Sequence, residues 1–426
     1  MVKLQKNISD FIAQYEKVSK LESKLFGEVF TPRKLIDEML DTLPEEVWNN
    51  SNLKWLDPAV GIGNFPAAIL DRLMIGLSDE IKDELERRKY ILEEMLYFCD
   101  ISIKNLFLLY KLFDCDNEFK LNVYRGSFLT DDFDKHMKDV WKLEGFDVVI
   151  GNPPYNDIPK SDIKRTSGAV IWDKFVKKSV ELINEEGFLV FVHPAIWRKP
   201  IDNRSKIFNI LEIFKKYNLM SLEIHNVSDG KKTFGAGTRY DFYCLNKSNI
   251  YNSTKIKDEN GLLNLVNIEK LNFIPNSNIE NIIKITNDDD DDDFIKVIYD
   301  SSYHANRDYI SDIETDFFKY PVVHSTPRSG ARILYSSRND KGHFGVPKVI
   351  FGEAGINNVI IDIDGEYGLT QGSIGLILEE NDDPLKIKTI LESDKFKNII
   401  HSCIWSNFRI DAKLFRYFKK NWYNTI

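Results

Sequence analysis

Residues 147–155 read DVVIGNPPY, and this stretch decides how the rest of the sequence is interpreted. Its first four residues form a short β-branched apolar run of the kind that makes a buried strand. Gly151 then frees the backbone, whereas Pro153 and Pro154 each remove an N–H donor and fix φ. The chain must therefore leave the sheet here, and we expect a stiff, exposed loop after the strand.

Three groups on that loop suit one kind of chemistry: the amide of Asn152, the backbone carbonyl of Pro153 and the ring of Tyr155. An exocyclic amino group on a heteroaromatic base is a poor nucleophile, because its lone pair is delocalised into the ring. The two acceptors could take its N–H hydrogens and favour a pyramidal nitrogen, while Tyr155 stacks on the ring. The alternative interpretation is a Pro-Pro turn that only makes a tight corner.

Length and composition indicate an ordinary globular protein of more than one domain. The chain has 426 residues, 43% of them hydrophobic, with 28 Phe and 18 Tyr, which is ample for two cores. Its four cysteines match neither a zinc pattern nor a disulfide framework, and no apolar run reaches membrane-spanning length. We therefore expect a soluble, intracellular, cytoplasmic protein with no metal and no membrane contact.

The net charge of −9 is a weak argument against a polyanionic partner, because nucleic-acid binding depends on local basic surface. Six of the acids lie in one run at 288–293, which we interpret as a solvated loop, with metal binding as a less favoured alternative. Residues 324–348 are basic, with Asp340 as their single acid. They carry the candidate phosphate-binding residues Arg328, Arg332, Arg338, Lys341 and Lys348. An ordinary solvated basic surface is the alternative.

Strand and helix patterns alternate along the first part of the chain. After an amphipathic helix predicted for residues 1–24, Thr31 is expected to cap a helix that begins at Pro32. Strands are then predicted at 53–56, 95–99, 121–124, 147–150, 188–193, 219–226 and at the end of 229–247. This order predicts an α/β fold with a doubly wound, mostly parallel, seven-stranded, Rossmann-like sheet over residues 1–250. Residues 251–426 are predicted to form a second, β-rich α+β domain.

Polar and small residues follow the ends of several predicted strands. LDPAVGIGNF at 56–65 places Gly61 and Gly63 in a turn where the backbone can approach a ligand closely. Asp100 ends the second strand, where it could accept hydrogen bonds from the ribose hydroxyls of an adenosine cofactor or cap the next helix. Ser127 and Phe128 follow the third strand. Because parallel strands end at one edge, we expect these residues to lie along one rim of the sheet.

These motifs, in this order, resemble the N6-adenine DNA methyltransferases of the gamma arrangement. FTP at 30–32 is similar to their motif X, LDPAVGIGNF to motif I, and Asp100 to the acid of motif II. GSFL at 126–129, NPPY at 152–155 and the helix beginning IWDKF at 171 are similar to motifs III, IV and V. The resemblance covers somewhat over half of the chain, and NPPY is its most specific part.

The resemblance implies S-adenosylmethionine as cofactor and assigns roles to residues that match the motifs. It places Thr31, Asp57, Ala59, Gly61 and Gly63 at the methionine part, Asp100 at the ribose, and Ser127, Phe128 and Phe175 at the adenine. Ser127 departs from the family, which has an acid there. The catalytic loop would be Asn152, Pro153, Pro154 and Tyr155. Phe234 is the best match for a second aromatic that covers the other face of a flipped base, with Tyr240 as runner-up.

The implied function is site-specific methylation of adenine N6 in duplex DNA, as in type II restriction-modification systems, with residues 251–426 as the target recognition domain. A separate cognate restriction endonuclease is a further implied partner. Release-factor glutamine methyltransferases and some RNA adenine methyltransferases share NPPY, but they usually lack motif X before motif I and a large C-terminal domain. The third alternative is a non-catalytic DNA-binding module that kept the methyltransferase fold.

Overall fold

The computed structural model describes residues 30–114, 116–157, 169–200, 209–250, 252–286, 294–405 and 409–426. The chain divides into two compact units: unit 1 extends to Ile268, and unit 2 comprises Glu269–Ile426 together with Arg198–Pro200. The helix predicted for residues 1–24 and the acidic run at 288–293 lie outside the described residues. No described helix is both long and apolar enough to cross a membrane.

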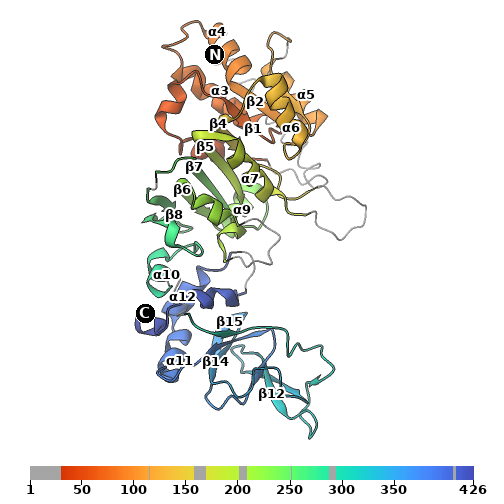
Figure 1. Cartoon of the computed structure of the whole chain (residues 1–426), viewed down its shortest axis with the longest axis vertical. Coiled ribbons are helices and arrows are strands. Elements are labelled where there is room, and N and C mark those ends of the chain that lie inside the picture. The colour runs from red at the N-terminus through yellow and green to blue at the C-terminus, as the bar shows by residue number, and fades with distance from the viewer. Residues whose placement is uncertain are drawn as a thin grey trace. The chain divides into compact units, whose positions relative to one another are not determined.

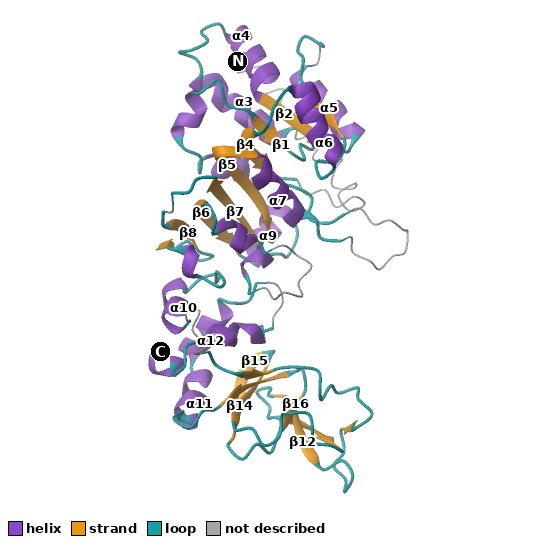
Figure 2. Cartoon of the chain, in the orientation of Figure 1, coloured by secondary structure: helices purple, strands orange, loops and turns teal. Residues whose placement is uncertain are grey.

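Unit 1 is built on a nine-stranded sheet with the order β3-β2-β1-β4-β5-β7-β6-β8-β9 (Figures 1 and 2). Its strands are β1 (Trp55–Asp57), β2 (Leu96–Asp100), β3 (Asn122–Arg125), β4 (Phe146–Gly151), β5 (Ile183–Pro194), β6 (Asn218–His225), β7 (Tyr240–Asn246), β8 (Thr254–Lys257) and β9 (Leu263–Val266). Strands β3, β2, β1, β4 and β5 are parallel, and β7 is antiparallel to β5 and β6.

The doubly wound, mostly parallel sheet predicted from the sequence is therefore confirmed. The predicted number of seven strands is too low, because β8 pairs with β6 and β9 pairs with β8. These two strands continue the sheet beyond residue 250, so the boundary predicted there falls inside unit 1. Their sequences are short and follow an Asn-rich stretch, which is why composition alone indicated a new domain.

Helices pack on this sheet through apolar faces. They are α2 (Arg33–Leu40), α3 (Asn64–Gly76), α4 (Glu84–Tyr90), α5 (Ile103–Phe113), α6 (Asp131–His136), α7 (Trp172–Leu182), α8 (Ile210–Phe214) and α9 (Val227–Phe234), with short turns η1 (Glu45–Asn49), η2 (Ile91–Met95), η3 (Met137–Trp141) and η4 (Ala195–Arg198). In α7, Trp172, Phe175, Val176 and Val180 form a buried apolar stripe. Burial of such a stripe is the main source of helix stability in a globular protein.

Two local predictions in unit 1 are wrong. Pro32, not Thr31, is the N-cap of α2, and its side chain has no capping hydrogen bond. Residues 229–234, which the pattern assigns to the loop before the last strand of 229–247, belong instead to helix α9, which a reciprocal capping box between Asn226 and Asp229 begins. An Asn followed three residues later by an acid is a valid helix start signal, and it explains why the glycine-containing sequence after it is helical.

Unit 2 contains two four-stranded sheets with the orders β10-β17-β14-β15 and β11-β13-β12-β16 (Figure 2). Its strands are β10 (Val297–Ile298), β11 (Ile310–Ser311), β12 (Tyr320–Ser325), β13 (Arg332–Ser336), β14 (Lys348–Gly352), β15 (Gly355–Asp362), β16 (Gly368–Leu369) and β17 (Ser373–Ile377). Its helical segments are α10 (Ile279–Ile285), α11 (Pro384–Glu392), α12 (Asp394–His401), η5 (Ile268–Lys270), η6 (Ala412–Tyr417) and η7 (Trp422–Asn424).

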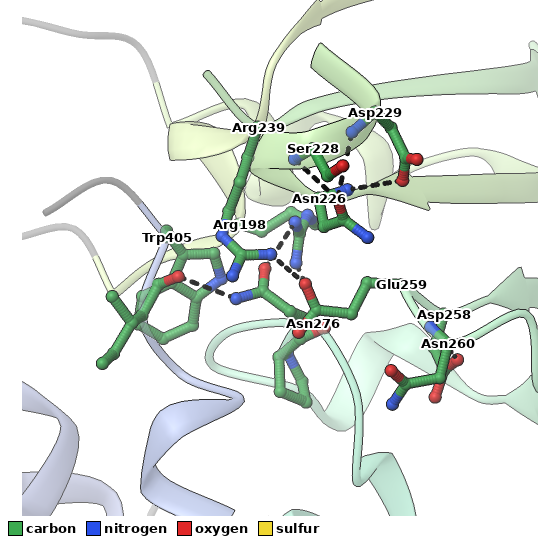
Figure 3. Close-up of polar contacts among 12 residues, drawn as sticks. Arg198, Asn226, Ser228, Asp229, Arg239, Asp258, Glu259, Asn260, Asn276 and Trp405 are labelled. Atoms are coloured by element: carbon green, nitrogen blue, oxygen red, sulfur yellow. Dashed lines mark hydrogen bonds and ion pairs between the residues drawn. The ribbon is translucent and has the colours of Figure 1, made fainter. Parts of the chain in front are cut away.

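Arg198 explains why three residues from the middle of the chain belong to unit 2. Its guanidinium is fully buried and donates to the backbone carbonyls of Ile274 and Pro275 and to the side-chain oxygen of Asn276 (Figure 3). The indole of Trp405 donates to the same Ile274 carbonyl. These contacts between residues distant in sequence hold residues 198–200 within the fold of unit 2.

One of the predicted phosphate-binding residues, Lys348, is buried inside unit 2. Its ammonium is completely buried and donates to Asp362 at 2.6 Å and to the carbonyls of His343 and Val346 at 2.9 and 3.0 Å. Burial lowers the pKa of this lysine, and the Asp362 carboxylate opposes that shift. A buried, ion-paired ammonium is not accessible to a DNA phosphate. The prediction that Lys348 binds DNA is therefore wrong, because the sequence pattern did not reveal its partner.

Replacing Asp362 by alanine is expected to leave the Lys348 ammonium buried without its counter-charge. Because breaking a buried ion pair in this way leaves an uncompensated charge, unfolding should become easier by about 3–5 kcal/mol. Urea unfolding followed by tryptophan fluorescence measures the change. The matched control is Asp364→Ala, since Asp364 is exposed two residues away. Equal unfolding midpoints for the two variants would contradict a structural role for the pair.

Candidate active site

The carboxyl ends of β1, β2 and β4 lie side by side because β1 pairs in parallel with both of the other strands. Asp57 accepts a hydrogen bond from the Ala59 N–H at 3.1 Å, and Asp100 accepts one from the Gly61 N–H at 2.9 Å. The two carboxylates thus hold the turn that follows β1. Gly61 and Gly63 adopt positive φ values of 54° and 95° there, a conformation that favours glycine.

Asp57 is a buried acid with one uncompensated oxygen. Its Oδ2 atom lacks a hydrogen-bond partner among the described residues, and burial, reinforced by Asp100, raises the pKa of its carboxyl to about 8. Asn64, at the start of α3, also has a buried side-chain oxygen, Oδ1, without a partner in the described structure. Two unsatisfied acceptors at one turn fit a cationic donor such as the ammonium group of a methionine moiety.

Asp100 lies at the end of β2 and is buried. Besides the Gly61 N–H, it accepts from the Ser102 N–H at 2.7 Å and from the Asn105 side chain at 3.3 Å. It does not cap α5: the N-cap is Ser102, whose hydroxyl accepts from the Asn105 N–H. The capping alternative for Asp100 is therefore wrong. Donors from Gly61, Ser102 and Asn105 instead fix the position of its carboxylate.

Phe128 and Phe175 form an aromatic wall beyond the end of β3. The two rings stack with centroids 5.3 Å apart and planes 25° apart, and both are buried. The Lys178 ammonium lies 5.3 Å from the centre of the Phe128 ring and donates to the Thr130 carbonyl. The hydroxyl of Ser127 accepts from the Leu129 N–H at 3.3 Å, so it stabilises its own turn. The sequence-predicted pair of phenylalanines is brought together.

The loop after β4 begins against Asp57. A Cβ atom at Gly151 would lie 2.8 Å from Asp57 Oδ1, so only glycine fits this position. Next in the chain, Asn152 Nδ2 donates to the Thr31 hydroxyl at 3.0 Å. Pro153 is buried and Pro154 is exposed. The structure therefore places the start of the NPPY loop directly beside the acid of the first turn.

Tyr155 ends this loop, and its backbone carbonyl accepts from the Ile171 N–H just before α7 at 3.1 Å. Its ring is partly exposed, but its hydroxyl is buried. Burial raises the pKa of this hydroxyl well above its ordinary value, and the nearby Tyr240 adds to the shift. The phenol is therefore neutral over an even wider pH range than an exposed tyrosine.

Phe234 and Tyr240, the two candidates for a second stacking aromatic, differ in accessibility. Tyr240 is buried and its ring stacks on His225 with centroids 4.4 Å apart and planes 5° apart. Phe234 is only partly buried and meets the Tyr240 ring edge to face at 4.8 Å. Since one face of Tyr240 is already occupied, the structure favours Phe234. It is the last residue of α9, whose start the Asn226 capping box fixes (Figure 3).

The segment between α9 and β7 is anchored from two sides. Arg239 forms an ion pair with Glu259, in the turn between β8 and β9, and both side chains are largely buried (Figure 3). The carbonyl of Arg239 accepts from the Ala195 N–H. Behind α9, a Cβ atom at Gly230 would lie 2.0 Å from the Thr238 carbonyl, so the helix packs closely on this segment. The extra strands β8 and β9 thereby help to hold Phe234 in place.

The remaining basic candidates lie on the surface of unit 2. Arg328 is exposed in the turn between β12 and β13, and Arg332 is exposed at the start of β13. Lys341 is also exposed. Arg338 is exposed but donates to both oxygens of Asp340, at 2.8 and 2.6 Å, which offsets its charge. Within unit 2, the hairpin of β12 and β13 therefore keeps Arg328 and Arg332 as its accessible cations.

Sequence reasoning missed one polar residue of the site and one contact within it. Asn64 belongs to the GNF segment of motif I and donates from Nδ2 to the Thr31 carbonyl at 3.4 Å. The bond between Thr31 and Asn152 joins residues 121 positions apart in the chain. The only available signal was the presence of a polar residue directly after Gly63, since a single sequence does not show which distant side chains meet.

Comparisons with known proteins agree with this geometry. Residues 85–234 match the family model described as Eco57I restriction-modification methylase, a range that contains Asp100, the NPPY loop and Phe234. The chain is 28% identical over 272 residues to an uncharacterized adenine-specific methylase of Mycoplasma pneumoniae, covering 49% of this chain and 63% of that protein. It is 27% identical over 200 residues to the type II methyltransferase M.BstVI of Geobacillus stearothermophilus, covering 40% and 34%.

The chain thus spans less than two thirds of the length of these curated relatives. Among solved structures, a nuclease-deletion mutant of the type ISP restriction-modification enzyme LlaGI, in complex with a DNA substrate mimic, has a TM-score of 0.51 at 13% identity. That likeness of fold covers 90% of this chain and 53% of the LlaGI chain. The resemblance to adenine-specific restriction-modification methyltransferases that the motifs predict is confirmed.

Replacing Asp57 by asparagine should change both stability and ligand affinity. Because the folded pKa near 8 exceeds the ordinary value of 3.8, the contribution of this acid to stability is lost as the pH rises towards 8. The asparagine variant cannot ionise, so its stability relative to the unchanged chain should grow by up to about 1.4 kcal/mol per pH unit between about pH 5 and pH 8. It should also bind S-adenosylmethionine more weakly.

Thermal unfolding of the ligand-free proteins across this pH range, with calorimetric titration of S-adenosylmethionine, measures both effects. Asp79→Asn is the matched control, since Asp79 is exposed. Parallel stability curves for the unchanged chain and Asp57→Asn would show that Asp57 is not a perturbed acid.

Proposed function

We propose that this chain transfers a methyl group from S-adenosylmethionine to N6 of a flipped adenine at specific sites in duplex DNA. The observation that carries the proposal is that the NPPY loop starts next to Asp57. Gly151, directly before the loop, packs against the buried Asp57 carboxyl group, whose Oδ2 atom has no hydrogen-bond partner among the described residues. A site for a cationic ligand and a loop suited to an amino acceptor therefore share one edge of the sheet.

The residues present fit S-adenosylmethionine. Asp57 and the turn containing Ala59, Gly61 and Gly63 would hold its methionine part, with Thr31 nearby. The Asp100 carboxylate would accept from the ribose hydroxyls, and the Phe128 and Phe175 wall, with Ser127, would adjoin the adenine. When bound, the cofactor supplies an electrophilic methyl group on a sulfonium.

The protein's part in the reaction is to position and polarise the acceptor. The Asn152 oxygen and the Pro153 carbonyl would accept the two N6 hydrogens, so that the nitrogen lone pair points away from the ring plane. That lone pair takes the methyl carbon, the electron pair of the carbon–sulfur bond stays on sulfur, and N6 releases one proton. S-adenosylhomocysteine and N6-methyladenine are the products. Positioning supplies much of the rate in such a reaction.

Stacking would compensate for removing the base from the duplex. Unpairing and unstacking cost a few kcal/mol, and each aromatic contact to a base is worth roughly 1–3 kcal/mol. Phe234 meets the Tyr240 ring edge to face, and Tyr240 also helps to raise the pKa of the Tyr155 hydroxyl, which supports a role for Tyr155 and Phe234 as the two sides of a base slot. Pro154, exposed directly before Tyr155 in the loop, would shield the acceptor from water.

Unit 2 would provide target recognition. Its exposed Arg328, Arg332 and Lys341, with Arg338 partly neutralised by Asp340, are suited to phosphate and base contacts. The family model that residues 85–234 match is described as a restriction-modification methylase. A separate endonuclease with the same specificity would be the functional partner, and the cytoplasm would be the place of action.

Transfer of a tritiated methyl group from S-adenosylmethionine tests the proposal. Unmethylated duplex DNA, RNA and a protein mixture serve as acceptors, and label should enter the DNA alone. Asn152→Ala should lose at least about 100-fold in rate, since an essential positioning acceptor is removed, while binding the cofactor normally. Label in RNA or protein instead would favour the alternative methyltransferase classes, and failure to bind the cofactor would favour a non-catalytic module.

A further inference from the structure

Thr31 lies at the junction between the two halves of the site. It is buried, directly precedes Pro32 and the helix α2, and makes two contacts with different motifs. Its hydroxyl accepts from Asn152 Nδ2 at 3.0 Å, and its carbonyl accepts from Asn64 Nδ2 at 3.4 Å. A threonine at a helix start normally caps the helix, but here the side chain is directed to the catalytic loop instead.

We propose that Thr31 is a positioning residue that holds the Asn152 amide in place for the acceptor nitrogen. This inference rests on the proposed amino-group chemistry of the loop. The two ends of an asparagine amide are almost the same size, and rotation about the last side-chain bond is broad and roughly two-fold. Only one of the two orientations offers an acceptor to an amino group; the other offers N–H donors to N–H donors.

The hydrogen bond from Nδ2 to the Thr31 hydroxyl restricts that rotation and keeps Nδ2 on the side of Thr31. While the Thr31 hydroxyl accepts from Nδ2, the other end of the same amide, Oδ1, is turned away from Thr31. Thr31 itself is buried, and its backbone carbonyl accepts from Asn64 Nδ2. Asn64 directly follows Gly63, so the turn that holds Asp57 also determines where Thr31 lies. The methyl-donor side and the acceptor loop are thus linked through one residue.

This role differs from a cofactor contact in what it does to the kinetics. A residue that only binds S-adenosylmethionine changes the affinity for the cofactor, and its loss is overcome at saturating concentration. A residue that only orients Asn152 changes the rate of transfer with every substrate saturating. Thr31→Val tests this, because it removes the hydroxyl while keeping the shape of the side chain.

The experiment measures kcat on unmethylated duplex DNA and the Kd for S-adenosylmethionine by calorimetry. At saturating S-adenosylmethionine, Thr31→Val should lower kcat by roughly tenfold or more, the effect of one lost hydrogen bond to a polar group, whatever the change in Kd. Thr31→Ser keeps the hydroxyl and should retain most of kcat. Thr42→Val is the matched control, since Thr42 Oγ1 bonds to the Met39 carbonyl at the other end of α2.

Thermal unfolding checks that all variants are folded. Unchanged kcat in Thr31→Val overturns the inference, as does a loss that saturating cofactor restores or one that serine fails to rescue. If the unchanged chain transfers no methyl group to any acceptor, the proposed function fails and the inference fails with it. Transfer by the unchanged chain that Thr31→Val leaves intact rejects the inference alone.

Discussion

The parallel pairing of β1 with both β2 and β4 is the constraint on which the site depends. Parallel strands in a doubly wound sheet end at one edge, so residues that follow three separate strands meet there although they are far apart in the chain. Asp57, Asp100 and Asn152 come together in this way. A shift of one residue in either pairing would turn these side chains to the other face and separate them. The apolar residues of these strands, which are buried throughout β1 and β2, fix the register.

The burial of Asp57 at this edge of the sheet is electrostatically unfavourable. Asp57 is buried beside a second carboxylate, and one of its oxygens has no partner in the described structure, so its burial opposes ionisation. Such an arrangement weakens the free protein and becomes favourable when a cation binds. Gly151 contributes by leaving room for the carboxylate at the start of the catalytic loop. The geometry therefore couples ligand binding to the place where the acceptor is held.

The elements and their order followed from the sequence because apolar runs, glycines and prolines act locally. Residues 95–99 and 147–150 were predicted as strands; the structure places the first one residue further along, at Leu96–Asp100, and extends the second by one residue at each end, to Phe146–Gly151. Contacts between residues distant in the chain could not be predicted from the sequence. The hydroxyl of Thr31 bonds to Asn152 rather than capping a helix, and Lys348 pairs with Asp362 inside unit 2 rather than facing solvent. Charge and capping patterns describe residue types, whereas these outcomes depend on which distant partner the fold supplies.

Mass spectrometry of nucleosides tests the central claim most directly, since it identifies the atom that receives the methyl group. Unmethylated DNA is incubated with the purified chain and S-adenosylmethionine, digested to nucleosides and compared with a sample treated with Asn152→Ala. The account predicts N6-methyldeoxyadenosine in the first sample and its absence from the second. Methylcytosine as the product, or equal amounts of methyladenine with the unchanged chain and the variant, would contradict the role assigned to the loop after β4.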